Sequence, residues 1–203
     1  MYGKTLRTFD RMIEVGNLEK PYTLIPYSWI IGIEEMDKNW LSDKERFYID
    51  LFLFSIYTGG STMAEMACFN RNEIVEGMIR SKRIATSKMA TISITKKIEA
   101  IIEKYRGRCF KNYLLPVFTY KHRTPYQQAG RIKRISELTN RTIKKVCEHL
   151  GIETEITLSA ARKIFIAHMI GYLIPYEAIA LWVGCSPYTV IRHHEKINQA
   201  LKE

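Results

Sequence analysis

Hydrophobic residues recur at helical spacing along most of this 203-residue chain, and the spacing changes in one window, residues 73–95. Within that window, short β-prone runs occur at 78–79, 83–84 and 91–94, and Gly77 and polar residues separate them. Runs of this length, bounded by turn residues, are typical of strands joined by tight turns. The sequence therefore predicts a mainly α fold with one small antiparallel β-sheet.

Capping residues mark where the predicted helices begin and end. Ser42 opens a helix that stops before Gly59, and Thr124, followed by Pro125, opens a longer one that stops at Gly151. A hydroxyl cap, a proline in the first turn and a glycine after the last turn are the usual signals of helix ends. We expect the remaining helices at 5–15, 28–36, 62–69, 98–105, 158–172, 175–183 and from 187 to the C-terminus.

The chain divides into two unequal parts on this basis. Residues 1–27 form a predicted lead-in helix and a proline-containing linker, and residues 28–203 form one helical domain. The whole chain contains 46% hydrophobic residues, and the second part is long enough to bury one substantial core.

The net charge of +10 is concentrated toward the C-terminus, because residues 107–203 carry +8 of it. Eight of these cations lie from Lys121 to Lys145, six of them in the predicted helix that follows Thr124, and Glu137 is the one acidic residue in this stretch. A basic stripe on a helix favours a polyanionic partner such as nucleic acid. A solvated helix face in a basic protein is the alternative.

Other classes of site are not indicated. The four cysteines, Cys68, Cys109, Cys147 and Cys185, lack the paired close spacing of a structural zinc site. We therefore expect no metal and no cofactor. The chain also contains neither a signal-peptide pattern nor a run of about 20 apolar residues, so we expect an intracellular protein without a membrane partner.

Several short strings, taken in order, resemble the catalytic domain of tyrosine recombinases, the phage integrase family. Residues 51–58 (LFLFSIYT) with 63–67 (MAEMA) are similar to its first conserved helix pair, especially as found in integrases of Bacteroides-type mobile elements. Residues 160–165 (AARKIF) resemble its second arginine box, and 183–186 (VGCS) with 194–197 (HEKI) resemble its tyrosine-bearing C-terminal helix. The resemblance covers roughly residues 28–200 and implies a recombinase catalytic-domain fold, with the family's N-terminal core-binding domain absent from this sequence.

The resemblance implies a set of site residues. The family cleaves DNA with a tyrosine nucleophile, two arginines, a lysine on a sheet turn and two histidines or their equivalents. The second arginine corresponds to Arg162, the sheet lysine to Lys88, and a further cation to Lys163. Arg162 could instead be a helix-surface or ion-paired arginine. Lys88 could instead be one of several surface-turn cations, together with Lys82 and Arg83.

Four other positions depart from the family pattern. Either Gly59 or Ser61 stands at the first arginine, Ser159 and Cys185 stand at the two histidines, and His194 stands at the tyrosine. Loss of one charge-stabilising group commonly costs about 100- to 1000-fold in turnover. The sequence therefore predicts a degenerate active site, and hence a pseudoenzyme.

The leading hypothesis is a DNA-binding domain of an integrase-like protein from a mobile element, acting in the bacterial cytoplasm at the nucleoid. Cations on the basic helix and on the last helices are the expected contacts to double-stranded DNA: Arg131, Lys133, Arg134, Lys144, Lys145, Arg162, Lys163 and Arg192.

Two alternatives stay open. The chain could be an active recombinase that uses His193, His194 or Tyr188 as the nucleophile. It could also be an interaction module whose C-terminal helix docks on a second copy or on a partner recombinase, through the apolar positions Val190, Ile191, Ile197 and Leu201.

Overall fold

The computed structural model describes residues 22–84 and 86–202. Its helices are α2 (Tyr27–Glu35), α3 (Asp43–Tyr57), α4 (Met63–Cys68), α5 (Lys96–Tyr105), α6 (Pro125–His149), α7 (Ala161–Gly171), α8 (Tyr176–Val183) and α9 (Pro187–Ala200). Three short 3-10 helices, η1 (Arg71–Glu73), η2 (Arg106–Arg108) and η3 (Leu158–Ala160), lie between them. The strands are β1 (Ile74–Val75), β2 (Met78–Lys82) and β3 (Met89–Ser93).

The predicted fold class is confirmed in its main features. The described residues form a mainly helical structure with one three-stranded antiparallel sheet in the order β1-β2-β3. Helices α3 and α6 begin at Ser42 and Thr124, and in both the cap residue forms a capping box with the third helical residue. The helix expected at 5–15 lies outside the described residues.

The prediction for the strands was wrong in two places. Arg83 and Ile84 do not form a strand. The backbone N–H of Arg83 donates to the carbonyl of Lys88 at 2.8 Å, where the chain turns from β2 to β3. The first strand is Ile74–Val75, which is too short to produce a period of its own in the sequence.

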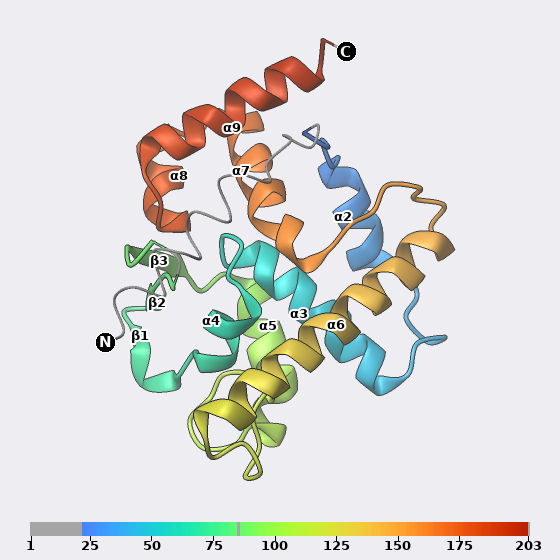
Figure 1. The fold of residues 1–203 in the computed structure, drawn as a ribbon, viewed down its shortest axis with the longest axis vertical. Coiled ribbons are helices and arrows are strands. Elements are labelled where there is room, and N and C mark those ends of the chain that lie inside the picture. Colours follow the sequence, from blue (N-terminus) through green and yellow to red (C-terminus); the bar gives the residue numbers. More distant parts are fainter. Residues whose placement is uncertain (1–21, 85, 203) are drawn as a thin grey trace, which may run out of the picture.

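Helix α3 lies at the centre of the domain. Every residue from Tyr48 to Ile56 is buried, and the helix packs against α5, α6 and α7. Figure 1 shows α6 crossing α3, while the sheet lies to one side. A helix that is apolar on nearly all faces is expected to be surrounded by other elements.

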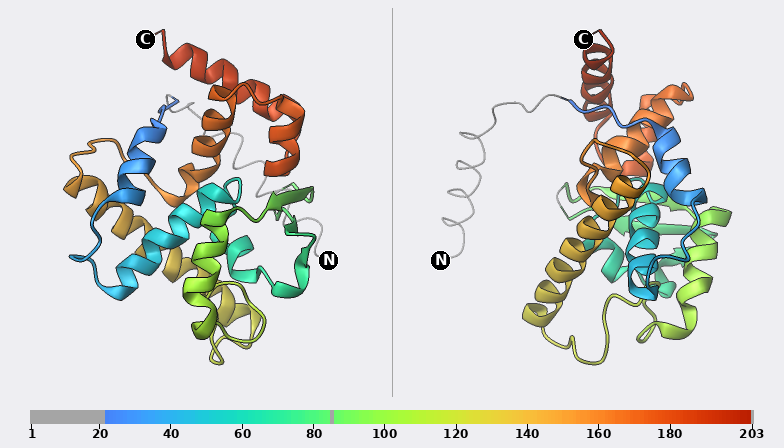
Figure 2. Two further views of the ribbon diagram at one scale, coloured as in Figure 1. Left: turned by 180° about the vertical axis from the view of Figure 1, so that it is seen from behind. Right: turned by 90° about the vertical axis from the view of Figure 1, so that its right-hand side faces the viewer.

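A second, smaller hydrophobic cluster joins α7, α8 and α9. Ile166, Ile179, Val183 and Val190 form its buried centre. These helices lie together at the end of the molecule where the C-terminus is found, as both views in Figure 2 show. The predicted site residues Arg162, Lys163, Arg192 and His194 are therefore carried by one compact group of helices.

Candidate functional site

The site begins at the turn between α3 and α4, residues 58–61, here called the helix junction. Gly60 has a φ of +73°, and a Cβ placed on it would lie 2.2 Å from the Cα of Arg162 in α7. Such contact requires a glycine, because any side chain would overlap the α7 backbone. The guanidinium of Arg162 in turn donates to the carbonyl of Gly60 at 3.3 Å.

A buried arginine from the turn after β2 reaches this junction. Arg83, the residue that follows β2, is 0% exposed. Its Nη1 donates to the Ser61 hydroxyl at 2.7 Å, and its Nη2 donates to the carbonyls of Thr58 and Gly59 at 3.0 and 3.4 Å. The guanidinium therefore stabilises the junction from inside.

Glu65 balances the charge of Arg83. Its carboxylate lies 3.0 Å from Nη1 of Arg83, and the residue as a whole is 4% exposed. Burial alone would raise the pKa of Glu65, but backbone N–H bonds from Thr62 and Ile84, with the charge of Arg83, hold that pKa below its usual range. Glu65 also caps α4 through Thr62, so one carboxylate joins a helix start to the sheet turn.

The same arginine fixes the turn between α8 and α9. Its Nε donates to the carbonyl of Val183 at 2.8 Å, and the Thr86 hydroxyl donates to the carbonyl of Gly184 at 2.9 Å. A Cβ on Gly184 would lie 2.6 Å from the Cγ of Arg83, and Gly184 adopts the left-handed φ of +71°. The junction, the sheet turn and the α8–α9 turn thus form one packed unit.

This network decides what Arg83 can do chemically. A guanidinium has five N–H donors, and the five hydrogen bonds of Arg83 engage one donor on Nε and two on each Nη. No donor remains for a ligand, and the side chain has no exposed surface. Arg83 therefore stabilises the junction through its hydrogen bonds and cannot serve as a phosphate-binding arginine there.

Three of the predicted site residues do come together beside this unit. The charges of Arg162 and Lys88, like that of Arg83, act on the thiol of Cys185. Burial raises the pKa of Cys185, and these cations offset part of the increase. Lys88 is exposed and Arg162 is half-buried, so both cations can meet a ligand approaching from solvent.

A cavity of about 240 Å³, which we call the His193 pocket, lies between α7 and α9. Residues from the N-terminal segment, α7 and α9 line it: Tyr22, Lys163, Tyr188, Thr189, Arg192, His193 and Lys196. Burial is the main cause that lowers the pKa of His193, and four cations lower it further: Lys163, Lys196, Arg162 and Arg192. The imidazole is therefore biased toward its neutral form.

Two predicted site residues point elsewhere. Nδ1 of His194 forms a hydrogen bond of 2.6 Å with the hydroxyl of Tyr176 in α8. The hydroxyl of Ser159 bonds that of Thr157 at 2.8 Å on an exposed surface. It is His193, one residue earlier on α9, that faces the cations of α7.

The predicted DNA contacts on α6 are separate from this group and differ from one another. Lys133 is exposed, and Lys144 lies 3.9 Å from Glu148 on the surface. Lys145 is engaged within the molecule, because its Nζ bonds Glu45 at 2.6 Å and lies 5.1 Å from the centre of the Trp40 ring.

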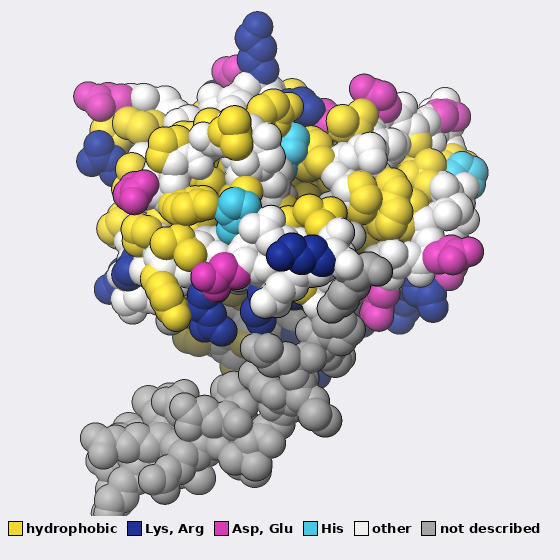
Figure 3. Space-filling model, turned by 90° about the horizontal axis from the view of Figure 1, so that it is seen from above, with side chains coloured by type: hydrophobic (Ala, Val, Ile, Leu, Met, Phe, Trp, Pro, Cys, Tyr) yellow, Lys and Arg dark blue, Asp and Glu magenta, His cyan; other side chains and the backbone are white. Residues whose placement is uncertain are grey.

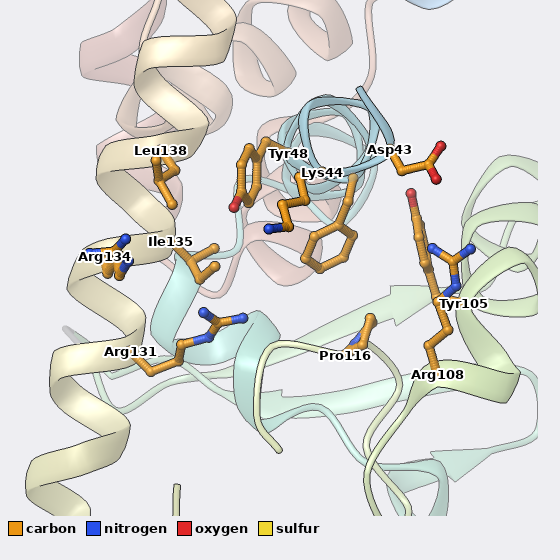
Figure 4. Close-up of a pocket in the computed structure, with 11 residues that line it drawn as sticks. Asp43, Lys44, Tyr48, Tyr105, Arg108, Pro116, Arg131, Arg134, Ile135 and Leu138 are labelled. Atoms are coloured by element: carbon orange, nitrogen blue, oxygen red, sulfur yellow. The ribbon is translucent and has the colours of Figure 1, made fainter. Parts of the chain in front are cut away.

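The other two predicted contacts on α6, Arg131 and Arg134, line a cavity of about 540 Å³. Figure 4 shows Arg131 directed from α6 toward Lys44, with Arg108 on the far side. Arg131 also donates to the carbonyl of Val117 at 3.0 Å. This cavity is basic, with Arg134 at its edge and Asp43 as the acidic residue of its lining.

The predicted docking surface on α9 is partly used within the domain. Val190 and Ile197 are buried, whereas Leu201 is exposed. Figure 3 shows that the face over α7–α9 nevertheless carries many hydrophobic side chains. Leu173, in the α7–α8 turn, is 90% exposed and has a φ of +58°.

No group of three or more His, Cys, Asp or Glu side chains suited to a metal ion occurs in the described part of the chain. Within the same residues, the helices are too short or too polar to cross a bilayer.

Sequence reasoning missed two features of the site. Arg83 was interpreted as a surface-turn cation, although its partners lie up to 100 positions away in the sequence. His193 was grouped with His194, although the two rings face different elements. A helical-wheel comparison of α9 with Val190 and Ile197 as the buried face would have separated the two histidines.

Comparison with known proteins supports the fold. No family model and no curated protein matches the sequence. Among solved structures, the chain is similar to a lambda integrase dimer bound to a COC′ core site, with 12% identity and a TM-score of 0.59, over 89% of this chain and 63% of that one. It is also similar to the XerA recombinase, with 15% identity and a TM-score of 0.57, over 94% of this chain and 67% of that one.

The chain thus has a fold resembling the tyrosine recombinase catalytic domain, as the sequence predicted. It spans about two thirds of the length of the two solved proteins. Identities of 12% and 15% show the fold alone.

Proposed function

We propose that this chain is a DNA-binding domain of an integrase-like protein of a mobile element, and that it no longer cleaves DNA. The observation that carries the proposal is the difference in accessibility between two arginines. Arg162 lies at the surface beside further cations, whereas Arg83 is enclosed and has all its donors engaged.

The binding half of the proposal rests on charge placement. Cations from α7, α9 and the sheet turn gather around the helix junction and the His193 pocket: Lys88, Arg162, Lys163, Arg192 and Lys196. Clustered cations of this kind neutralise DNA phosphates and release counterions. The lambda integrase with a similar fold is bound to a DNA core site, which agrees with this use of the fold.

The loss of chemistry rests on what the site lacks among the described residues. Phosphodiester cleavage through a covalent intermediate needs a nucleophile and several donors that converge on the nonbridging oxygens. Arg162 is the one guanidinium at the junction that solvent reaches, since Arg83 is sealed. His194, at the expected nucleophile position, is held by Tyr176.

The test is fluorescence anisotropy of a labelled duplex of about 30 base pairs, titrated with protein between about 50 and 200 mM salt. We expect affinity to fall steeply with salt. Replacing the exposed Arg192 in Arg192→Met should reduce the slope of log affinity against log salt by about one. Arg106→Met is the matched control, because Arg106 is also exposed but lies in η2 and pairs with Glu103.

The same samples, run on a denaturing gel with a nicked suicide duplex, test for cleavage. We expect no covalent adduct. An adduct would contradict the loss of chemistry, and an adduct abolished by His193→Phe would identify a substitute nucleophile. Binding that does not respond to salt, or no binding at all, would contradict the DNA-binding half.

A further inference from the structure

The His193 pocket gathers positive charge from two helices. Three side chains that carry or can carry charge converge on it from α9, and Lys163 joins them from α7. No carboxylate lines the pocket among the residues that the structure describes. Like charges gathered in a partly enclosed space repel one another, and an anion in that space removes the repulsion.

Two tyrosines complete the walls. The ring of Tyr22 meets His193 edge-on at 6.0 Å between centroids, and Nζ of Lys163 lies 5.5 Å from the centre of the same ring. Burial raises the pKa of Tyr22 to about 12, so its phenol stays protonated and can donate to an anion. Tyr188 lies at the exposed rim.

His193 itself has an unmet hydrogen-bonding capacity. Its Nδ1 is buried and has no partner among the described residues. An unpartnered buried ring nitrogen is costly, and a charged oxygen beside it would supply the missing bond. A protonated imidazole donates from both nitrogens, so an anion also favours uptake of a proton.

We propose that the His193 pocket receives one phosphate of the bound DNA and that His193 gains a proton when that phosphate enters. This inference rests on the proposed function, because it names the group of the DNA that the site takes and the residue that senses it. The groups facing the ring are the cations Arg162 and Lys163 of α7, the cations Arg192 and Lys196 of α9, and Tyr22 of the N-terminal segment.

The coupling follows from the charges around the ring. In the free protein, burial and the neighbouring cations hold the pKa of His193 below its usual range, so the ring is neutral near pH 7. A phosphate cancels part of that positive field and raises the pKa in the complex. Affinity should therefore increase as the pH falls through the pKa of the complex, and level off below the pKa of the free protein.

The experiment compares adjacent histidines in the full chain. DNA affinity is measured by anisotropy with the same duplex at constant salt, from about pH 8 to about pH 5.5, for the unmodified protein, His193→Gln and His194→Gln. Glutamine keeps a neutral polar side chain but cannot be protonated. His194 is the matched control, because it lies on the same helix but bonds Tyr176.

We expect the affinity of the unmodified protein to increase by up to about tenfold per pH unit over the range in which one proton is taken up. His194→Gln should keep this dependence. His193→Gln should lose it and should bind as the unmodified protein does at about pH 8.

Three outcomes would overturn the inference. Equal pH dependence in the unmodified protein and His193→Gln would show that His193 does not take up the proton, while salt-sensitive binding would still support the proposed function. An equal loss of affinity at every pH in His193→Gln would assign the residue a structural role. Absence of DNA binding by the unmodified protein would refute the proposed function and this inference together.

A direct readout separates the proton from other effects on affinity. In ¹⁵N spectra of the histidine rings at about pH 7, the nitrogens of His193 should move to the shifts of the protonated ring when the duplex is added. The nitrogens of His194 should not. A His193 ring that remains neutral in the saturated complex would contradict the proposal.

Discussion

Replacing Arg83 should destabilise the domain more than replacing any exposed arginine of the sheet. In Arg83→Met, the guanidinium and its five hydrogen bonds are lost, and the carboxylate of Glu65 stays buried without its cation. Removing one partner of a buried ion pair typically costs about 3–5 kcal/mol. That amount is a large share of the roughly 5–15 kcal/mol that holds a domain folded, so the variant should be partly unfolded at 37 °C.

The measurement is urea unfolding at pH 7, followed by circular dichroism at 25 °C. Arg80→Met is the matched control, since Arg80 lies three residues earlier, in β2, and is exposed; it should change the free energy of unfolding by less than about 0.5 kcal/mol. Arg83→Lys retains a charge but not the planar fork, so its stability should lie between those of Arg83→Met and the unmodified protein.

A double-mutant cycle with Glu65→Gln tests whether the effect of Arg83→Met comes from the lost ion pair with Glu65 and not only from the loss of a buried side chain. If Arg83 and Glu65 stabilise the fold as a pair, the double variant should be less destabilised than the sum of the single variants, by about 0.5–3 kcal/mol. The reasoning would be refuted if Arg83→Met cost less than about 1 kcal/mol, or if the effects of the two substitutions simply added.

Two further predictions concern the backbone of the junction and the start of α3. Gly60 and Gly77 both have a left-handed φ, but of these two positions only Gly77 has open space for a Cβ. Gly77→Ala should therefore cost about 1–2 kcal/mol, and Gly60→Ala should destabilise the domain by clearly more. Equal changes in the midpoint of urea unfolding would contradict the close packing at Gly60. The Glu45–Lys145 pair should make stability sensitive to acid. Hydrogen bonds from Lys145 and Ser42 lower the pKa of Glu45 to about 2. The contribution of Glu45 to the free energy of unfolding is therefore complete above the unfolded pKa near 4.5 and is lost as the pH falls toward 2. In Lys145→Met, unfolding midpoints measured across that range should fall less steeply, and an unchanged slope would show that the pair contributes nothing.

Much of the fold could be predicted from the sequence because its signals are local. The caps Ser42 and Thr124 act on N–H groups three residues away, and the predicted and observed bounds of α3 and α6 agree closely. The sheet was predicted less well. β1 has only two residues, and the run at Arg83 and Ile84 resembles a strand although it lies in the turn after β2, where Arg83 is buried and Ile84 is 66% exposed.

The candidate site depended on information that the sequence holds only at long range. Arg83 is buried because it bonds the carbonyls of Thr58 and Val183, which are distant in the sequence, and no local pattern predicts that these groups lie close together. The choice between His193 and His194 is a matter of helix phase. Successive residues on a helix point about 100° apart, so an alignment uncertain by one residue cannot say which histidine faces α7.

Binding and cleavage make different demands on such a site, and the structure separates them. Contact with a DNA phosphate needs accessible cations, which Arg162 and Arg192 supply without a strictly fixed geometry. Cleavage needs several donors fixed on one phosphate, and at the junction the donors of Arg83 are directed inward to backbone carbonyls and Glu65. The residues that maintain the shape of the site are thus ones that a ligand cannot reach. Substitution of Arg83 should therefore lower stability first, and substitution of Arg192 or His193 should change DNA binding in a protein that remains folded.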